Sequence, residues 1–191
     1  KVVRLTDEGK IPPDNPFVKR AGARAEIWSY GIRNPQGMAM NPWSDTLWLN
    51  EHGPRGGDEI NIPEKGKNYG WPLATHGINY SGLKIPEAKG EHVEGTEKPL
   101  FVWKVSPAVS GMAFYNSDVF PQWKNKLFIG ALKEKDVIVL SVKGNTVTED
   151  GRILGDKDQR IRDVRVGPDG YLYVLTDETD GQLLKVSPSG S

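Results

Sequence analysis

Four basic side chains stand beside short apolar runs and are the residues best suited to bind an anion. Arg33 precedes the run "GMAM", Lys133 follows "LFIGAL", and Arg160 and Arg162 precede "VRV". An arginine offers a planar fork to a carboxylate, and a lysine offers a mobile point charge. Taken singly, each is better explained as an exposed cation paired with a nearby acid. Their equivalent places beside repeated runs favour one cleft for a ligand with several negative charges.

The stretch "EHGPRGGDEIN" is the second group of residues that could do chemistry. Gly53 lacks a side chain and Pro54 lacks an amide hydrogen, so a turn there can direct successive carbonyl oxygens outward. Asp58 and Glu59 add carboxylates, and Ca²⁺ prefers carbonyl and carboxylate oxygens. Spacing alone favours a plain glycine-rich turn with solvated acids, because no EF-hand pattern is present.

Other kinds of chemistry find little support in the chain. The histidines His52, His76 and His92 lack the spacing of an HExxH metal site, and no cysteine is present to form a thiolate site. There is no G-x-S-x-G, Walker or Rossmann glycine motif. Lys and Arg together number 25, as do Asp and Glu, so no overall field attracts nucleic acid or an anionic membrane. No apolar run approaches the roughly 18 residues that span a bilayer.

The elements that must position these residues are short strands in a repeating order. Each repeat has an alternating strand, a turn with Pro, Asp or Asn, and a second apolar strand. The repeats are "GMAMNPWSDTLWLNEHG" from Gly37, "GMAFYNSDVFPQWKNKLFIGAL" from Gly111 and "DVRVGPDGYLYVLTDE" from Asp163. Closing strands that end in a glycine turn also recur: "VVRLTDEGK", "EINIPEKGK", "VIVLSVKGN" and "LLKVSPSGS". Together they predict an all-β chain of about three four-stranded antiparallel blades of a β-propeller, with a β-sandwich as the alternative.

The number of blades bears on the domain organisation. Propellers close with roughly four to eight blades, and three blades leave open faces. We therefore expect residues 1–191 to form about half of a single propeller domain, completed by residues upstream of Lys1 or by another chain. The opening "KVVRLTDEGK", without Met and already strand-like, agrees with this expectation. A stretch at about residues 65–109 interrupts the repeat, and its length and aromatic residues predict an ordered, functional loop.

Four segments resemble the soluble PQQ-dependent sugar dehydrogenases, most closely the bacterial aldose sugar dehydrogenases. They are "YGIRNPQGMAMNP", "EHGPRGGDEINIPEKGKNYGWP", "LFIGALKEKDVIVL" and "QRIRDVRVGPDGYLYVLTDE". The resemblance runs in order through nearly the whole chain. It implies a six-bladed propeller that binds pyrroloquinoline quinone (PQQ) and Ca²⁺ and oxidises the anomeric carbon of aldoses to lactones.

The same resemblance implies which residues contact the cofactor. These would be Arg33, Asn34, Lys133, Arg160 and Arg162, with Tyr80 of the less well matched loop as a further contact to PQQ or to an ion.

It also implies two calcium sites and a sugar pocket. The carbonyls of Gly53 and Pro54 would bind the catalytic Ca²⁺, and the Glu59 carboxylate and Tyr69 carbonyl would bind a second, structural Ca²⁺. Asp58 and Glu59 are neighbours, so in an extended segment they face opposite sides and only one can point toward the carbonyl turn. His52, where some relatives carry Gln, would line the pocket and not act as the base.

The resemblance places the catalytic base, a histidine, in an earlier blade that has no matching segment here. No catalytic residue is therefore assigned within the chain, and the 191 residues alone are expected to be inactive. The partners implied are an aldose and the upstream half of the propeller, with neither nucleic acid nor a membrane span. The family implies a periplasmic or secreted location. The sequence leaves open the preferred aldose, the natural electron acceptor and the formation of a homodimer.

Two other functions fit a propeller. A non-catalytic propeller that binds a partner on its rim needs neither Ca²⁺ nor clustered cations. A calcium-dependent propeller lactonase needs a carboxylate cluster in the channel and no cationic cradle for a cofactor. Reduction of a dye by glucose after addition of PQQ and Ca²⁺ separates these readings from the dehydrogenase.

Overall fold

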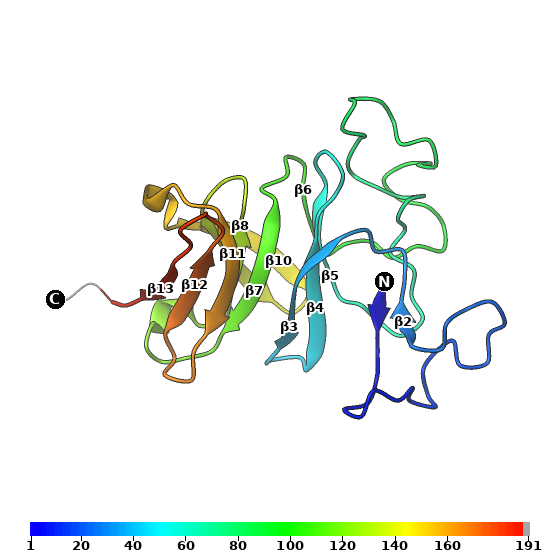
Figure 1. Cartoon of the computed structure of the whole chain (residues 1–191), viewed down its shortest axis with the longest axis horizontal. Helices are drawn as coiled ribbons and strands as arrows, with labels where there is room; N and C mark the ends of the chain where they lie inside the picture. The colour runs from blue at the N-terminus through cyan, green and yellow to red at the C-terminus, as the bar shows by residue number, and fades with distance from the viewer. Residues whose placement is uncertain (189–191) are drawn as a thin grey trace.

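Short antiparallel sheets follow one another along the computed structural model, which describes residues 1–188 (Figure 1). In each sheet, strands that are neighbours in sequence are paired with each other. The strands are β1 (Val2–Val3), β2 (Ile27–Ser29), β3 (Pro35–Asn41), β4 (Thr46–Glu51), β5 (Asp58–Asn61), β6 (Phe101–Trp103), β7 (Val109–Tyr115), β8 (Lys126–Ala131), β9 (Val137–Lys143), β10 (Thr146–Ile153), β11 (Ile161–Val166), β12 (Leu172–Thr176) and β13 (Leu183–Val186). Helical structure among these residues is limited to the 3₁₀ turns Pro121–Trp123 and Gly155–Lys157.

The first strands of successive sheets lie side by side. The sheets β3–β6 and β7–β10 have four strands each, and β3 contacts β7, which in turn contacts β11 of the sheet β11–β13. Inner strands that line up in this way, each starting an antiparallel meander, are the arrangement of consecutive propeller blades. The all-β propeller prediction is confirmed. Within the described residues no helix is long and apolar enough to cross a bilayer.

The strands differ from the expected blades in detail. Two sheets have the expected four strands, whereas β11–β13 has three and β1–β2 has two. The outer strands β6 and β10 were not predicted: β6 has only three residues, and β10 is largely exposed and carries a register shift at Gly151. Three residues are too few to show an alternation, and a largely exposed strand has few apolar residues to alternate. The turn expected at Gly190 lies outside the described residues.

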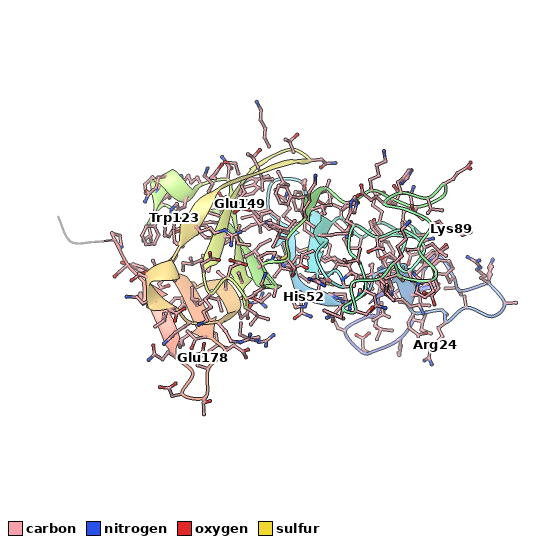
Figure 2. All side chains as sticks on the ribbon, turned by 90° about the horizontal axis from the view of Figure 1, so that it is seen from above. Arg24, His52, Lys89, Trp123, Glu149 and Glu178 are labelled. Atoms are coloured by element: carbon pink, nitrogen blue, oxygen red, sulfur yellow. The ribbon has the colours of Figure 1, made fainter. Side chains whose placement is uncertain are left out.

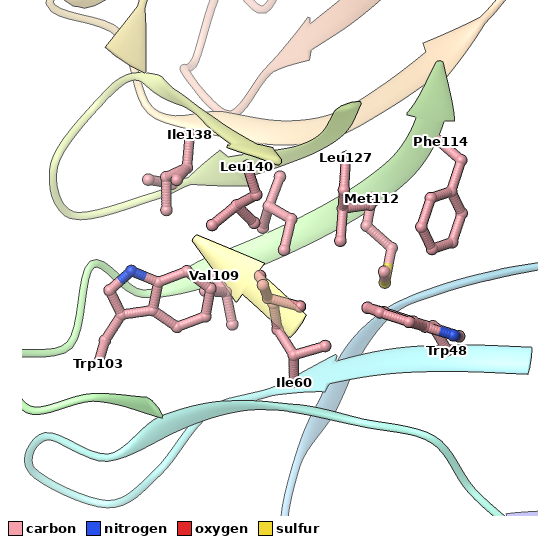
Figure 3. Packing of buried hydrophobic residues seen from close by; sticks show 12 residues of the cluster. Trp48, Ile60, Trp103, Val109, Met112, Phe114, Leu127, Ile138 and Leu140 are labelled. Atoms are coloured by element: carbon pink, nitrogen blue, oxygen red, sulfur yellow. The ribbon is translucent and has the colours of Figure 1, made fainter. Parts of the chain in front are cut away.

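The core consists of apolar layers between neighbouring sheets. One layer joins the sheets β3–β6 and β7–β10 (Figure 3), and another joins β7–β10 to β11–β13. Strand β8 supplies both layers, with Leu127 and Ile129 in the first and Phe128 in the second. Successive side chains of a strand point to opposite faces, so a strand buried on both faces reads as a continuous apolar run.

Two long loops lie beside this stack of sheets. Residues 4–26 join β1 to β2, and residues 62–100 join β5 to β6. The second loop is the predicted interruption, although β6 lies inside the expected range of 65–109. Arg24 and Lys89, one from each loop, lie toward the opposite end of the molecule from Trp123 and Glu178 (Figure 2). The longer loop buries the side chains of Tyr69 and Ile85, in agreement with an ordered segment.

Candidate functional site

Two chain segments meet at one end of the sheet β3–β6. Arg33 and Asn34 lead into β3, and the turn that starts at His52 joins β4 to β5. The Arg33 Nη1 donates to the carbonyl oxygens of His52 at 3.1 Å and Gly53 at 2.9 Å. The His52 amide donates to the Asn34 carbonyl at 3.0 Å. Side chain and main chain therefore hold the two segments together, close to the middle of the long axis of the molecule, where His52 lies (Figure 2).

Two buried carboxylates accept hydrogen bonds from the main chain of both segments. The Glu51 Oε2, at 4% exposure, accepts the amides of Arg33 at 2.6 Å and Asn34 at 3.1 Å. Asp58 is fully buried: one oxygen accepts the Gly53 amide at 3.2 Å, and the other accepts the Ser106 hydroxyl and the Val109 amide. Buried carboxylates need such partners to offset the loss of hydration.

The sequence suggested Asp58 only as a carboxylate that could bind Ca²⁺, and it suggested no role for Glu51. The structure shows that both oxygens of Asp58 are used within the protein. The available signal was an acid at the end of a buried strand, directly beside a glycine-rich turn.

The turn between β4 and β5 depends on glycine. A Cβ on Gly53 would overlap the carbonyl oxygens of Gly56 and Gly57. Gly56 and Gly57 have φ angles of 80° and 74°, in the left-handed region that favours glycine. Gly77 of the long loop lies so close that its own Cβ would overlap the Gly56 carbonyl oxygen. The turn and the long loop therefore make a tight, main-chain contact, and Arg55 pairs with Ile78 across it.

A small cavity of about 20 Å³ lies beneath the turn. Six residues predicted to bind the cofactor, metal or sugar lie among its walls, namely Arg33, His52, Gly53, Pro54, Glu59 and Tyr69, together with Glu51. A cavity of this size holds one water molecule or ion. Glu59 and Asp58 point to opposite sides of β5, as predicted, since Glu59 lines the cavity and Asp58 faces the Ser106 side.

Electrostatics favour a cation in this cavity. Burial, followed by repulsion from Glu51, raises the pKa of Glu59 to about 8. Burial also raises the pKa of Glu51. One amide group, the Asn61 Nδ2, donates to both carboxylates at 3.3 Å. Glu51 also accepts the Arg33 and Asn34 amides, and the Arg33 charge acts to lower its pKa, so Glu59 is the carboxylate that a bound cation would stabilise more.

The donor set around the cavity suits a hard cation held mainly by main-chain oxygens. No group of three or more His, Cys, Asp or Glu residues in the described part of the chain is arranged to hold a metal. The Tyr69 hydroxyl donates to the Ile62 carbonyl and accepts the Glu64 amide at 2.9 Å. Burial raises the pKa of Tyr69 to about 12, so this hydroxyl stays protonated. The Tyr69 hydroxyl is thus already engaged, which leaves the carbonyl as the oxygen of this residue that could face an ion.

A larger pocket of about 760 Å³ opens on the other side of the turn. It brings together His52, Gly53, Pro54, Tyr80 and Lys133. Within residues 1–188 the Lys133 ammonium makes only long contacts, 3.3 Å to the Ser106 carbonyl and 3.4 Å to Glu134. Tyr80 is 70% exposed at the rim. This volume lies within the usual range of small-molecule sites.

The ring of His52 is fixed as part of the pocket wall. Its Nε2 lies 2.6 Å from the Val109 carbonyl oxygen. A carbonyl only accepts hydrogen bonds, so Nε2 carries the proton. This contact agrees with the interpretation of His52 as a pocket residue and not as the base.

The remaining predicted residues line neither cavity. Asn34 contacts the site through the His52 amide. Arg160 and Arg162 both bind the Asp177 carboxylate, with shortest contacts of 3.0 Å and 2.9 Å. Their side chains point to one side of the strand, as the spacing predicted. The hydrogen bond from Arg162 is the main reason that the pKa of Asp177 is lowered. The pairing of both arginines with Asp177 agrees with the alternative given for each cation taken singly, an exposed cation paired with a nearby acid.

Comparison with known proteins places the chain among sugar dehydrogenases. Residues 1–185 match the family model described as glucose/sorbosone dehydrogenase. The chain is 82% identical over 188 residues to the aldose sugar dehydrogenase YliI of Escherichia coli (strain K12), covering 98% of this chain and 51% of that protein.

Solved structures show the same relationship. The crystal structure of the soluble aldose sugar dehydrogenase of Escherichia coli in its apo-form superimposes with a TM-score of 0.97 and 81% identity, over 99% of this chain and 55% of that one. The PQQ-bound aldose sugar dehydrogenase of Streptomyces coelicolor superimposes with a TM-score of 0.72 and 27% identity, over 97% and 51%.

The fold makes this chain part of an all-β propeller, with polar residues gathered at one end of its sheets. The match of the family model along nearly the whole chain then decides which family it belongs to. The chain belongs to the glucose/sorbosone dehydrogenase family. It spans about half the length of the relatives described above.

Proposed function

We propose that this chain supplies part of the cofactor and calcium site of a PQQ-dependent aldose sugar dehydrogenase, which oxidises the anomeric carbon of an aldose to a lactone. The observation that carries the proposal is the junction of Arg33, His52 and Gly53 above an oxygen-lined cavity. The names of the relatives support the reaction, and the PQQ-bound relative supports the cofactor.

The basic residues suit a flat cofactor that carries three carboxylates. The hydrogen bonds of the Arg33 guanidinium go to carbonyl oxygens, and Trp71 lies under it at 5.3 Å, so its charge stays available to an anion. Lys133 is weakly held beside the larger pocket. Arg160 and Arg162 would exchange part of their contact with Asp177 for the cofactor. Tyr80 and Asn34 would complete the contacts to PQQ.

The oxygen groups suit calcium at two places. The carbonyls of Gly53 and Pro54 would hold the catalytic ion, because a carbonyl oxygen has a second lone pair beside the one that Arg33 uses at Gly53. The Glu59 carboxylate and the Tyr69 carbonyl would hold a structural ion in the small cavity. Held by these residues, PQQ would supply a hydride acceptor for the sugar, and Ca²⁺ would supply Lewis acidity at the cofactor.

The rest of the enzyme is proposed by family likeness. The chain would form the C-terminal half of a six-bladed propeller domain, with the residues between β5 and β6 as a long insertion. The general base would come from the other half, and His52 would line the sugar pocket. The complete protein would work in the periplasm or outside the cell, and a homodimer is compatible with the proposal.

Reconstitution tests the proposal. We expect the full-length protein to reduce a dye with glucose after addition of PQQ and Ca²⁺, and the 191-residue chain to remain inactive. No turnover by a folded, loaded full-length protein would contradict the proposed function. Turnover by the 191 residues alone would contradict the assignment of the base to the other half.

A further inference from the structure

Glu51 is a buried carboxylate to which the reading of the sequence assigned no role. It ends β4, directly before His52, and its side chain is surrounded by protein at 4% residue exposure. Its Oε2 accepts two consecutive amides, those of Arg33 and Asn34, at 2.6 and 3.1 Å. Its Oε1 accepts the Asn61 Nδ2 at 3.3 Å.

These contacts matter because residues 31–34 lie outside any strand. The Arg33 and Asn34 amides come just before β3, so the sheet does not hold them in place. Both hydrogen bonds are partly shielded from water, where an amide without an acceptor is destabilising. The carboxylate therefore decides where this part of the main chain settles.

The same residue also sets the position of the facing turn. His52 and Gly53 follow Glu51 directly, and their carbonyls accept the Arg33 guanidinium. One carboxylate thus ties the main chain of Arg33 to the end of β4, while the Arg33 side chain ties back to the turn that leaves β4. These contacts together fix the orientation of the Arg33 guanidinium and of the His52 and Gly53 carbonyl oxygens.

We propose that Glu51 is a positioning residue, which holds Arg33 and Asn34 in the geometry that binds the anionic cofactor. This inference rests on the proposed function. Glu51 acts by accepting hydrogen bonds from the main chain, and contact with the sugar or the cofactor is not part of its role.

Three variants of the full-length protein distinguish the hydrogen bonding of the Glu51 side chain from its negative charge. Glu51→Gln keeps an oxygen that can accept both amides. Its new amide would face the Asn61 Nδ2, and turning the Asn61 side-chain amide over presents Oδ1, which has no hydrogen-bond partner among the described residues, as an acceptor. Glu51→Asp withdraws the carboxylate by one methylene group, and Glu51→Ala removes it. Asn41→Ala is the matched control, because the buried Asn41 Oδ1 accepts the Trp43 amide at 2.9 Å at the other end of β3.

Two measurements are made on each variant. Hydrogen exchange of the Arg33 and Asn34 amides reports on the main chain directly and needs no cofactor. Titration with PQQ at saturating Ca²⁺, followed by absorbance, reports on cofactor affinity separately from turnover. We expect faster exchange and at least about tenfold weaker PQQ binding in Glu51→Ala, a smaller effect in Glu51→Asp, and affinity within about threefold of the parent in Glu51→Gln.

Each outcome supports or overturns the inference. Unchanged exchange in Glu51→Ala overturns it, as does faster exchange with unchanged PQQ affinity, which would make the role purely structural. Equal losses in Glu51→Gln and Glu51→Ala overturn it in favour of charge, and an equal loss in Asn41→Ala overturns it in favour of general destabilisation. If Glu51→Ala does not fold, Glu51→Asp carries the test. A parent protein that binds no PQQ overturns the proposed function, and the exchange data then still decide whether Glu51 holds the segment.

Discussion

The layer between the sheets β3–β6 and β7–β10 and the polar end of β3–β6 are both buried, yet they consist of opposite kinds of side chain. The layer is formed by residues such as Ile60, Leu127 and Ile138, with no measurable exposure (Figure 3). The polar end is formed by Glu51 and Asp58, whose oxygens accept main-chain amides. Apolar contact is non-directional, whereas a hydrogen bond fixes distance and angle. The first region therefore stabilises the fold, and the second sets the orientation of the groups above it.

The comparison implies different tolerance to substitution. A core accepts apolar replacements of similar volume, because no direction has to be preserved. A buried carboxylate that serves several amides accepts no apolar replacement without leaving donors unpaired. Substitutions in the layer should thus change stability alone, and substitutions at the polar end should change both stability and ligand affinity.

The largest loss of stability is expected from the apolar layer. Leu127→Ala should lower the free energy of unfolding by about 2–5 kcal/mol, because it leaves a cavity between two sheets. Urea unfolding measures this change, with Leu127→Met as a volume-conserving control that costs less than about 1.5 kcal/mol. Affinity of the folded full-length variant for PQQ should stay at the parent value. A large loss of affinity would contradict the proposal that the apolar layer affects stability alone.

A smaller loss of stability with an added functional effect is expected at the polar end. Asp58→Ala leaves the Gly53 and Val109 amides and the Ser106 hydroxyl without their acceptor, which should cost about 2–3 kcal/mol. PQQ affinity at saturating Ca²⁺ should also fall, because the Gly53 turn loses its anchor. Asp58→Asn keeps the shape and one acceptor, so an intermediate result is expected. Parent affinity in a folded Asp58→Ala protein would contradict this assignment.

The third expectation concerns pH in the calcium-free protein. The pKa of Glu59 is about 8 in the folded state, against a reference value of 4.5, so the folded state holds the proton more tightly. Stability should be greatest below about pH 4.5 with respect to this group and should fall as pH rises to about 8. Thermal unfolding across this range measures the trend, which Glu59→Gln should flatten.

Added Ca²⁺ supplies the control for Glu59. Binding to the folded state alone raises the melting temperature by mass action, most strongly where Glu59 is ionised. Glu59→Gln should blunt this rise while leaving turnover of the folded variant at saturating Ca²⁺ and PQQ. Unchanged melting with collapsed turnover would instead place Glu59 at the catalytic ion.

The smallest effect on stability is expected at the exposed cations. Arg160 and Arg162 are 42% and 43% exposed in their contacts with Asp177, so Arg160→Ala or Arg162→Ala should change stability by less than about 1 kcal/mol. PQQ affinity of the full-length variants should nevertheless fall by roughly ten- to a hundred-fold, since a hydrogen bond to a charged group contributes about 1.5–3 kcal/mol. Unchanged titrations for both variants would leave these residues as ordinary surface ion pairs.

Much of the fold could be predicted from local patterns. Alternating apolar residues and turns such as Pro168-Asp169-Gly170 identified the strand pairs β3–β4, β7–β8 and β11–β12. The outer strands β6 and β10 escaped for different reasons: β6 is apolar but only three residues long, and β10 is mostly polar and exposed. Both are held in place by pairing with β5 and β9. Such a segment becomes a strand because the adjacent strand offers it hydrogen bonds, and its own sequence does not record this.

The candidate site was predicted less completely. The spacing of Arg160 and Arg162 correctly placed both side chains on one side, and that of Asp58 and Glu59 correctly placed theirs on opposite sides. The role of Glu51 escaped, because its partners precede it by 17 and 18 positions in the sequence. No local pattern records which amide a carboxylate will meet after folding.

The sequence by itself determined the strand repeat, the family and the residue types that face a charged ligand, because these depend on alternation, turn chemistry and motif. Tertiary structure alone decided the contact of Arg33 with the Gly53 carbonyl, the crowding that restricts Gly53 to glycine, and the sharing of Asn61 between Glu51 and Glu59. Burial also decided the raised pKa of Glu59. The physical reason is that desolvation and hydrogen-bond direction arise only when segments far apart in the chain are packed together.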